Sequence, residues 1–169
     1  MSKNYNHIPA VGQINNMACW AASLKWWYKA VLSINASQTA LWDRYQGLQT
    51  TLGGMTSGGI RHIISENAMY LVDYSSASAF TIEEAKRLLG CGPIYIAYTE
   101  SGTQKRHVNV IYKATGNSDY AEVHVMEPQA KNKGNGKWGG KLMTKPLNDF
   151  NLIGTIHCGV LRTAALGIG

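Results

Sequence analysis

Apolar residues in the first half of the chain recur every three to four positions, which is the period of an α-helix. Most of the segments with this pattern begin at a Ser or Thr, whose side chain can cap the first turn of a helix. Thr81 and Glu84 also have the spacing of a capping box, in which each side chain bonds the other residue's backbone N–H. Helices are predicted at residues 18–33, 37–45, 56–66 and 81–89.

From Pro93 onward the pattern changes to short apolar or alternating segments separated by turn residues, which is typical of β-strands. Helices followed by strands predict an α+β fold, with the helices packed on one side of an antiparallel sheet. No repeat or linker divides the chain, so residues 1–169 are interpreted as a single domain. Strands are predicted at residues 94–98, 107–112, 120–126 and 153–160, with a weaker one at 141–144.

Composition excludes several classes of protein. With 45% hydrophobic and 15% charged residues, the chain is not an intrinsically disordered one. No apolar run approaches the roughly 18 residues that a membrane helix needs. The first ten residues are polar and contain no apolar core of a signal peptide. We therefore expect no membrane partner, and a protein that is cytoplasmic or exported by a signal-independent route.

The net charge of +6 is concentrated in a lysine-rich stretch between Lys131 and Lys145. A nucleic-acid site of this kind would interleave several aromatic residues with the positive charges, and only Trp138 is present. We interpret the stretch as a solvated loop and expect no nucleic-acid partner.

Trp26 and Trp27 are adjacent on a predicted helix, so we expect one of them to be partly exposed.

Gln13 and Cys19, together with the distant His107, have the residue types of a cysteine nucleophile and the groups that assist it. Cys19 opens the first predicted helix, Gln13 precedes it by six positions, and His107 begins a later strand. A thiolate forms more readily at a helix N-terminus and beside an imidazole. The Gln13 amide could donate to an oxyanion at the same centre. The alternative is that Cys19 is a small buried apolar residue, as most unpaired cysteines are.

The histidine that acts as the base has to be chosen from several candidates. Of the five histidines, His107 stands at the start of a strand after a polar segment, where an imidazole can face a cleft, and His124 inside a strand is the reserve candidate. The three cysteines have no CxxC spacing, so a zinc site is not expected, and no organic cofactor is implied.

The motif of Gln13, Cys19, Trp20, Ala21 and Ser23 resembles the papain-like cysteine peptidases. His107 follows Cys19 by 107 − 19 = 88 residues, fewer than the roughly 130 or more of the plant and lysosomal enzymes. The chain is therefore more similar to compact bacterial relatives: staphopain-type proteases, effectors of plant pathogens and leader-cleaving domains of bacteriocin exporters.

The resemblance implies a papain-like fold, in which an N-terminal helical part carries the nucleophile and packs on a C-terminal antiparallel sheet. In that family an Asn or Asp near the end of the following strand holds the histidine. Glu127 has this position here and is expected to accept from Nδ1 of His107, with Asp119 and Asn109 as alternatives.

The function implied is that of a cysteine peptidase with a Cys19–His107–Glu127 triad and Gln13 in the oxyanion hole. Its partners would be a protein or peptide substrate and, if it is a bacterial effector or toxin, an immunity or inhibitor protein. Two alternatives stay open: an amidase, deamidase or transglutaminase on the same triad, and a non-catalytic binding domain with the papain-like scaffold.

Overall fold

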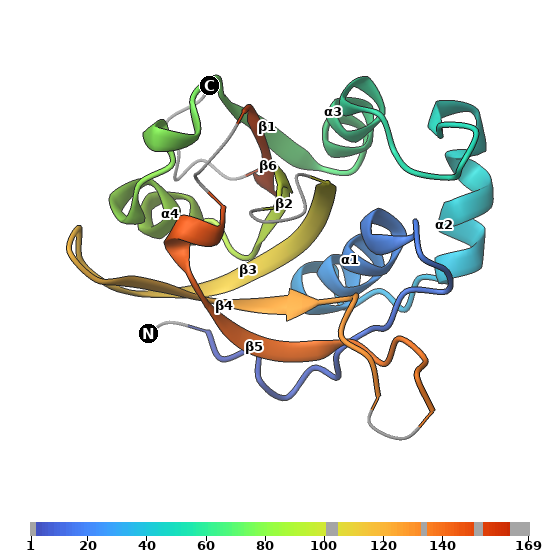
Figure 1. Cartoon of the computed structure of the whole chain (residues 1–169), viewed down its shortest axis with the longest axis horizontal. Coiled ribbons are helices and arrows are strands. Elements are labelled where there is room, and N and C mark those ends of the chain that lie inside the picture. Colours follow the sequence, from blue (N-terminus) through green and yellow to red (C-terminus); the bar gives the residue numbers. More distant parts are fainter. Residues whose placement is uncertain (1–2, 101–104, 133–134, 151–153, 163–169) are drawn as a thin grey trace.

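The computed structural model describes residues 3–100, 105–132, 135–150 and 154–162. They form a six-stranded antiparallel sheet with helices on both faces (Figure 1). The strand order is β1-β6-β2-β3-β4-β5, so the predicted α+β fold is confirmed. The strands are β1 (Met69–Tyr74), β2 (Ile94–Thr99), β3 (Arg106–Gly116), β4 (Ala121–Glu127), β5 (Lys141–Pro146) and β6 (Ile156–Leu161).

Five of these strands match predicted ones, including the weak β5, whereas β1 was not predicted. Its alternation is irregular, and only Met69 and Tyr74 at its two ends are buried. Pairing with β6, from Met69 opposite Leu161 to Tyr74 opposite Ile156, makes it a strand. Residue 153, where the last strand was predicted to begin, lies outside the described residues.

The helices begin where the sequence predicts. Side chains of Ser37, Thr56 and Thr81 each accept a hydrogen bond from a backbone N–H of the first turn. The capping box forms only in part, because the Glu84 carboxylate bonds the Tyr74 hydroxyl and Arg87 instead. The helices are α1 (Cys19–Trp27), continued by a π-helical turn (Tyr28–Leu32), α2 (Gln38–Arg44), α3 (Ser57–Glu66) and α4 (Ile82–Leu89).

Helices cover both faces of the sheet, not one face as predicted. Residues of α1, α2 and α3 share a core with one face of β2 and β3, while α4 packs on the opposite face (Figure 1). The reason lies in the central strand β2, whose residues Ile94 to Tyr98 are all buried. A strand that is apolar on both sides needs cover on both sides, and α4 supplies it with Ile82, Ala85 and Leu88.

The expectation that Trp26 or Trp27 is partly exposed is wrong, because both are fully buried. Trp26 packs against Tyr112 of β3 and against Tyr5 in the N-terminal segment. Trp27 donates from Nε1 to the carbonyl of Pro93, 3.0 Å away. The N-terminal segment thus covers a side of α1 that a sequence pattern alone leaves open.

The described residues between Lys131 and Trp138 form a loop, as predicted, but its base is anchored. Lys141 and Lys145, at the end of the stretch predicted to be a solvated loop, lie on β5 instead. The Lys131 ammonium lies 5.8 Å from the centre of the Trp138 ring. Gly12 approaches the backbone of Trp138 so closely that a Cβ there would lie 1.8 Å from the carbonyl oxygen. The loop therefore packs against the chain just before Gln13.

Among the described residues, no helix is long and apolar enough to cross a membrane.

Trp27 makes α1 part of the core, so its removal should destabilise the fold. Trp27→Ala is expected to lower the free energy of unfolding by about 3–5 kcal/mol, because it leaves a large cavity and an unpaired Pro93 carbonyl. Leu52→Ala, at a side chain that is 79% exposed, should change it by less than about 0.5 kcal/mol. Urea denaturation followed by tryptophan fluorescence and circular dichroism measures both. Equal small effects would contradict the buried position of Trp27.

Candidate active site

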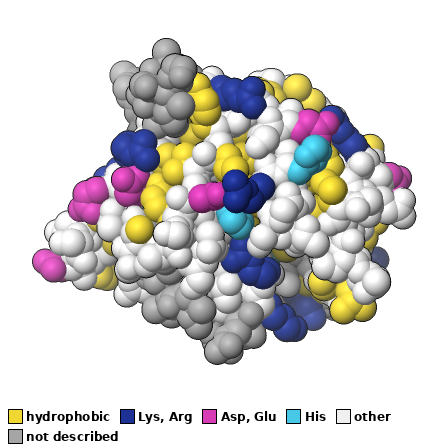
Figure 2. All heavy atoms as spheres, turned by 90° about the horizontal axis from the view of Figure 1, so that it is seen from above, with side chains coloured by type: hydrophobic (Ala, Val, Ile, Leu, Met, Phe, Trp, Pro, Cys, Tyr) yellow, Lys and Arg dark blue, Asp and Glu magenta, His cyan; other side chains and the backbone are white. Residues whose placement is uncertain are grey.

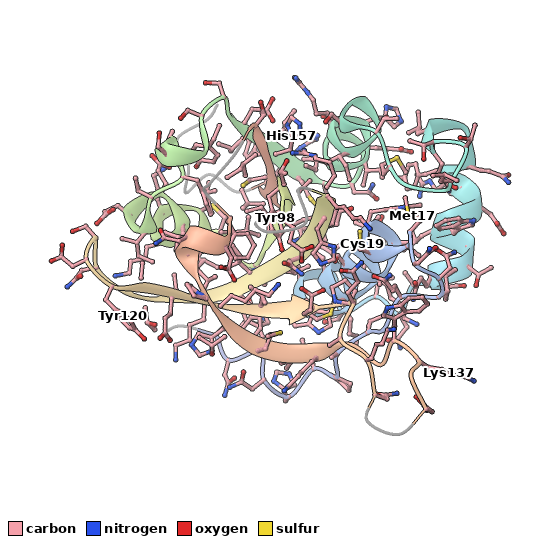
Figure 3. The ribbon with its side chains drawn as sticks, in the orientation of Figure 1. Met17, Cys19, Tyr98, Tyr120, Lys137 and His157 are labelled. Atoms are coloured by element: carbon pink, nitrogen blue, oxygen red, sulfur yellow. The ribbon has the colours of Figure 1, made fainter. Side chains whose placement is uncertain are left out.

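Cys19 is the first residue of α1 and is partly exposed (Figure 3). The preceding residue, Ala18, has no capping side chain, and the first turn contains no acidic residue. The first N–H groups of a helix have no partner within the helix, and they attract negative charge. The N–H groups of Ala21 and Ala22 bond the Ala18 carbonyl, and no carboxylate or hydroxyl of the first turn competes for those of Cys19 and Trp20.

The position of α1 on the sheet is fixed by hydrogen bonds directly after the cysteine. The Tyr95 hydroxyl on β2 donates to the Trp20 carbonyl at 3.0 Å. The Ser23 hydroxyl donates to the Val108 carbonyl on β3 at 3.1 Å. Both contacts are buried, so they hold the start of α1 beside the start of β3, one residue from His107.

His107 connects Cys19 to Glu127. Its side chain is only 2% exposed, and its Nε2 lies 2.7 Å from Oε1 of Glu127. Burial lowers the pKa of His107, but hydrogen bonds and charge interactions with Cys19 and Glu127 outweigh burial and raise it to about 10. The imidazole is therefore protonated at neutral pH. The Tyr98 ring packs edge-on against it, with the ring centres 5.9 Å apart.

The ring nitrogen that contacts Glu127 differs from the expected one. We predicted a bond from Nδ1, whereas the structure shows Nε2. With Nε2 engaged at 2.7 Å by the carboxylate, Nδ1 is the nitrogen left for Cys19, whose interaction with the imidazole helps to raise the pKa of His107.

Glu127 is buried and accepts hydrogen bonds on both carboxylate oxygens. Oε1 accepts from His107 and, at 2.9 Å, from the backbone N–H of Gln129. Oε2 accepts from Nδ2 of Asn109 at 3.0 Å and from Nζ of Lys145 at 2.6 Å. Burial raises the pKa of Glu127, but His107 and Lys145 lower it more, so its pKa falls well below the usual range. The carboxylate remains ionised.

Of the alternatives to Glu127, Asn109 is in the site and Asp119 is not. Asn109 is fully buried, and its side chain accepts from the Tyr98 hydroxyl at 2.5 Å while donating to Glu127. Asp119 lies in the exposed β3–β4 turn, where its N–H bonds Asn117. The reserve base, His124, lies on β4 before Val125 and packs against Tyr112 of β3. Burial lowers the pKa of His124.

Hydrogen bonds connect Gln13 both to the residue after Glu127 and to the turn before α1. Its backbone N–H donates to the Pro128 carbonyl at 3.2 Å. Its Nε2 donates at 2.8 Å to the Asn15 carbonyl, which also accepts from the N–H of Ala18. One N–H of the amide is therefore used beside the first turn of α1, which leaves the second N–H for another acceptor. The Oε1 atom is buried without a hydrogen-bond partner among the described residues.

The other two cysteines lie in the core. Cys158 is fully buried on β6, and burial raises the pKa of its thiol well above the usual value. Cys91 is 8% exposed and belongs to the core beneath α4. The described residues contain no cluster of three or more His, Cys, Asp or Glu side chains that could hold a metal ion.

A separate open pocket of about 610 Å³ lies between the start of α3 and the ends of β1 and β6. Figure 2 looks onto this end of the molecule, where basic, acidic and histidine side chains lie together. Asp73 in this pocket is already paired with His157 at 2.7 Å and Arg61 at 3.3 Å. None of Gln13, Cys19, His107 and Glu127 lines the pocket, and we assign it no role in the reaction.

Sequence reasoning did not assign Lys145 a role in the site. It was placed only at the edge of a basic stretch, and nothing in the sequence shows that β5 pairs with β4. The register of that pair, Glu127 opposite Lys141 and Val123 opposite Lys145, brings Lys145 onto the side of the sheet that carries Glu127. Only the folded chain therefore reveals this contact.

Comparisons with known proteins agree with the geometry. A family model described as papain-like cysteine protease AvrRpt2 matches residues 2–138. The peptidase domain of Streptococcus ComA, a bi-functional ABC transporter involved in a quorum sensing pathway, is 16% identical with a TM-score of 0.62, over 92% of this chain and 100% of that one. UfSP from C. elegans is 10% identical with a TM-score of 0.57, over 90% of this chain and 33% of that one. No curated protein matches.

At such identities the two structures show the fold alone. The predicted papain-like architecture, with the nucleophile-bearing helix on the antiparallel sheet, is confirmed by the ComA peptidase domain. The predicted resemblance to the papain-like cysteine peptidases is confirmed by the family match. The roles of the individual residues stay predictions.

The protonated state of His107 should determine how the thiol reacts with pH. Because the pKa of His107 is raised to about 10, the imidazolium that stabilises the thiolate is present below that pH and is lost as the pH rises through it. Alkylation by iodoacetamide should therefore occur first at Cys19 and remain fast from pH 6 to 9, as measured by peptide mass spectrometry.

His107→Ala should remove the fast reaction at pH 6 and make labelling rise with pH, as it does for an ordinary thiol. His124→Ala is the matched control and should leave the profile unchanged. Equal labelling of Cys19, Cys91 and Cys158 at pH 6 would contradict the pairing of Cys19 with His107.

Gln13→Ala should lower turnover by a factor of about 100 to 1,000, which is the usual effect of removing one oxyanion donor. Labelling of Cys19 should stay fast, because the imidazole is untouched. Steady-state kinetics and alkylation rates on the same preparation separate the two effects. A variant that keeps more than half of the wild-type turnover would show that Gln13 is only structural.

Proposed function

The chain belongs to the papain-like cysteine protease AvrRpt2 family, and we propose that it hydrolyses peptide bonds with Cys19 as the nucleophile. The observation that carries the proposal is a buried imidazole, His107, that lies 2.7 Å from the ionised Glu127 and whose pKa is raised by its interactions with both Glu127 and Cys19. This arrangement supplies a nucleophile, a proton donor and a group that orients the donor.

In the first step, the Cys19 thiolate attacks the carbonyl carbon of the peptide bond. A C–S bond forms, and the electron pair of the C=O bond moves to the oxygen. The N–H of Cys19 and the second N–H of the Gln13 amide then donate to that oxyanion. Their value is electrostatic, because donors fixed in advance need no rearrangement as the charge develops.

In the second step, the His107 imidazolium transfers its proton to the departing amine. The C–N bond breaks, and Cys19 is left as a thioester. Water then attacks the thioester carbonyl while neutral His107 takes a proton from it. The C–S bond breaks, and the carboxylic acid product leaves. The thiolate and the imidazolium are restored.

Glu127 acts on the imidazole throughout. It holds Nε2 at 2.7 Å, so Nδ1 stays directed at the sulfur and the leaving group. Its charge stabilises the imidazolium before the first proton transfer and again after water is deprotonated. Neither step uses a metal ion or an organic cofactor.

The substrate is a protein or peptide. An effector or toxin role, with an immunity or inhibitor protein as a partner, extends this proposal and is supported by the short separation of Cys19 and His107, which is similar to that of compact bacterial peptidases.

A proteome-derived peptide library tests the proposal. Wild-type protein should generate new N-termini, and each cleaved pair should gain the mass of one water. Cys19→Ala should give none, with unchanged circular dichroism and thermal stability. Intact peptides that gain about one mass unit, or become joined to an added amine, would identify deamidation or acyl transfer instead. Intact, unmodified peptides together with slow labelling of Cys19 would contradict a catalytic role.

A further inference from the structure

Lys145 has an unusual position for a lysine. It lies on β5, its side chain is only 13% exposed, and its Nζ is 2.6 Å from Oε2 of Glu127. Lysines are almost never buried unless they are paired. Lys141 on the same strand stands directly opposite Glu127 in the backbone register, yet it is exposed. Lys145, not Lys141, therefore reaches the carboxylate.

The contact completes the hydrogen bonding of Glu127. Each carboxylate oxygen has two donors: His107 and the Gln129 N–H on Oε1, and Asn109 and Lys145 on Oε2. A glutamate has one more rotatable bond than the Asn or Asp expected in this place, and that bond must be held in one rotamer. Oε2 is held by Asn109 and Lys145, which leaves Oε1 pointing at His107.

Lys145 also balances the charge of the site. With a thiolate at Cys19, an imidazolium at His107 and a carboxylate at Glu127, the three groups carry a net charge of −1. Lys145 brings the total to zero. An unbalanced charge in a buried site is strongly destabilising. Lys145 is also one of the groups that lower the pKa of Glu127 against the opposing effect of burial.

We propose that Lys145 is a positioning residue of the peptidase site, which keeps Glu127 ionised and aimed at His107 and acts on the reaction only through that carboxylate. The inference rests on the proposed function. It separates Lys145 from a lysine that merely stabilises the β4–β5 pair, because a stabilising lysine would act whether or not a carboxylate is present at position 127.

A double-mutant cycle on the full chain tests this separation. Lys145→Met is made in the wild type and in Glu127→Gln, which keeps an acceptor oxygen and should retain partial activity. Lys145→Met should lower kcat about tenfold or more in the wild type, a loss comparable to that on removing the hydrogen-bond partner that orients a metal-bound histidine. In Glu127→Gln the same change should lower kcat by no more than about twofold. Lys141→Met is the matched control and should leave kcat unchanged.

A charge-retaining variant and a pH profile give two further measurements of the role of Lys145. Lys145→Arg retains the charge and should retain at least half of kcat. Lys145→Met should also move the acidic limb of the pH profile of kcat/KM to higher pH, because Glu127 then accepts a proton more readily. Glu127→Gln has no carboxylate to titrate and should show no such movement when Lys145 is replaced.

Where Glu127→Gln turns over too slowly, the rate of alkylation of Cys19 at pH 5.5 replaces kcat in the cycle. Where Lys145→Met fails to fold, Lys145→Gln takes its place. An equal loss in both backgrounds, or an equal loss in Lys141→Met, would overturn the inference and leave the peptidase intact. A wild-type protein that neither cleaves peptides nor labels rapidly at Cys19 would overturn the proposed function itself.

Discussion

The hydrogen bond between Glu127 and His107 is the interaction on which the site depends. Both side chains are buried, at 8% and 2% exposure, and the bond joins a carboxylate to an imidazole at 2.7 Å. Neither charge would persist there alone, since an isolated buried ion loses its solvation without compensation. Together, and with Lys145 on the other carboxylate oxygen, they form an arrangement in which a further charge at Cys19 can be stabilised.

The sheet makes this bond possible because its strands alternate in direction. The start of β3 and the end of β4 meet at one edge, with Val110 opposite Met126. A shift by one residue would turn His107 or Glu127 to the opposite face. The register changes between Ile111 and Lys113, where the pairing is irregular, so the part of β3 that carries His107 is set separately from the hairpin turn. The buried contacts of Trp20 and Ser23 then hold α1 against this edge.

Much of the fold and the site was predictable because the responsible signals are local. Caps at Ser37, Thr56 and Thr81 and the short apolar segments of β2 to β4 depend on neighbouring residues. The motif around Cys19 and a histidine at a strand start are likewise visible in the sequence. What failed depends on contacts between distant segments. Trp26 is covered by Tyr5, and α4 lies on the second face of the sheet. Lys145 reaches Glu127 from the neighbouring strand. The ring nitrogen that meets Glu127 depends on how the two side chains meet in the folded chain, which no sequence pattern records.

The central claim is that His107 is held as an imidazolium between Cys19 and Glu127. Nitrogen-15 NMR of the imidazole, followed from pH 5 to 11 with His107→Gln used to assign its signals, measures that protonation directly. The account predicts that both ring nitrogens stay protonated through neutral pH and that the titration is centred near a pKa of about 10. A His107 that titrates near 6.5, as an ordinary histidine does, would contradict it.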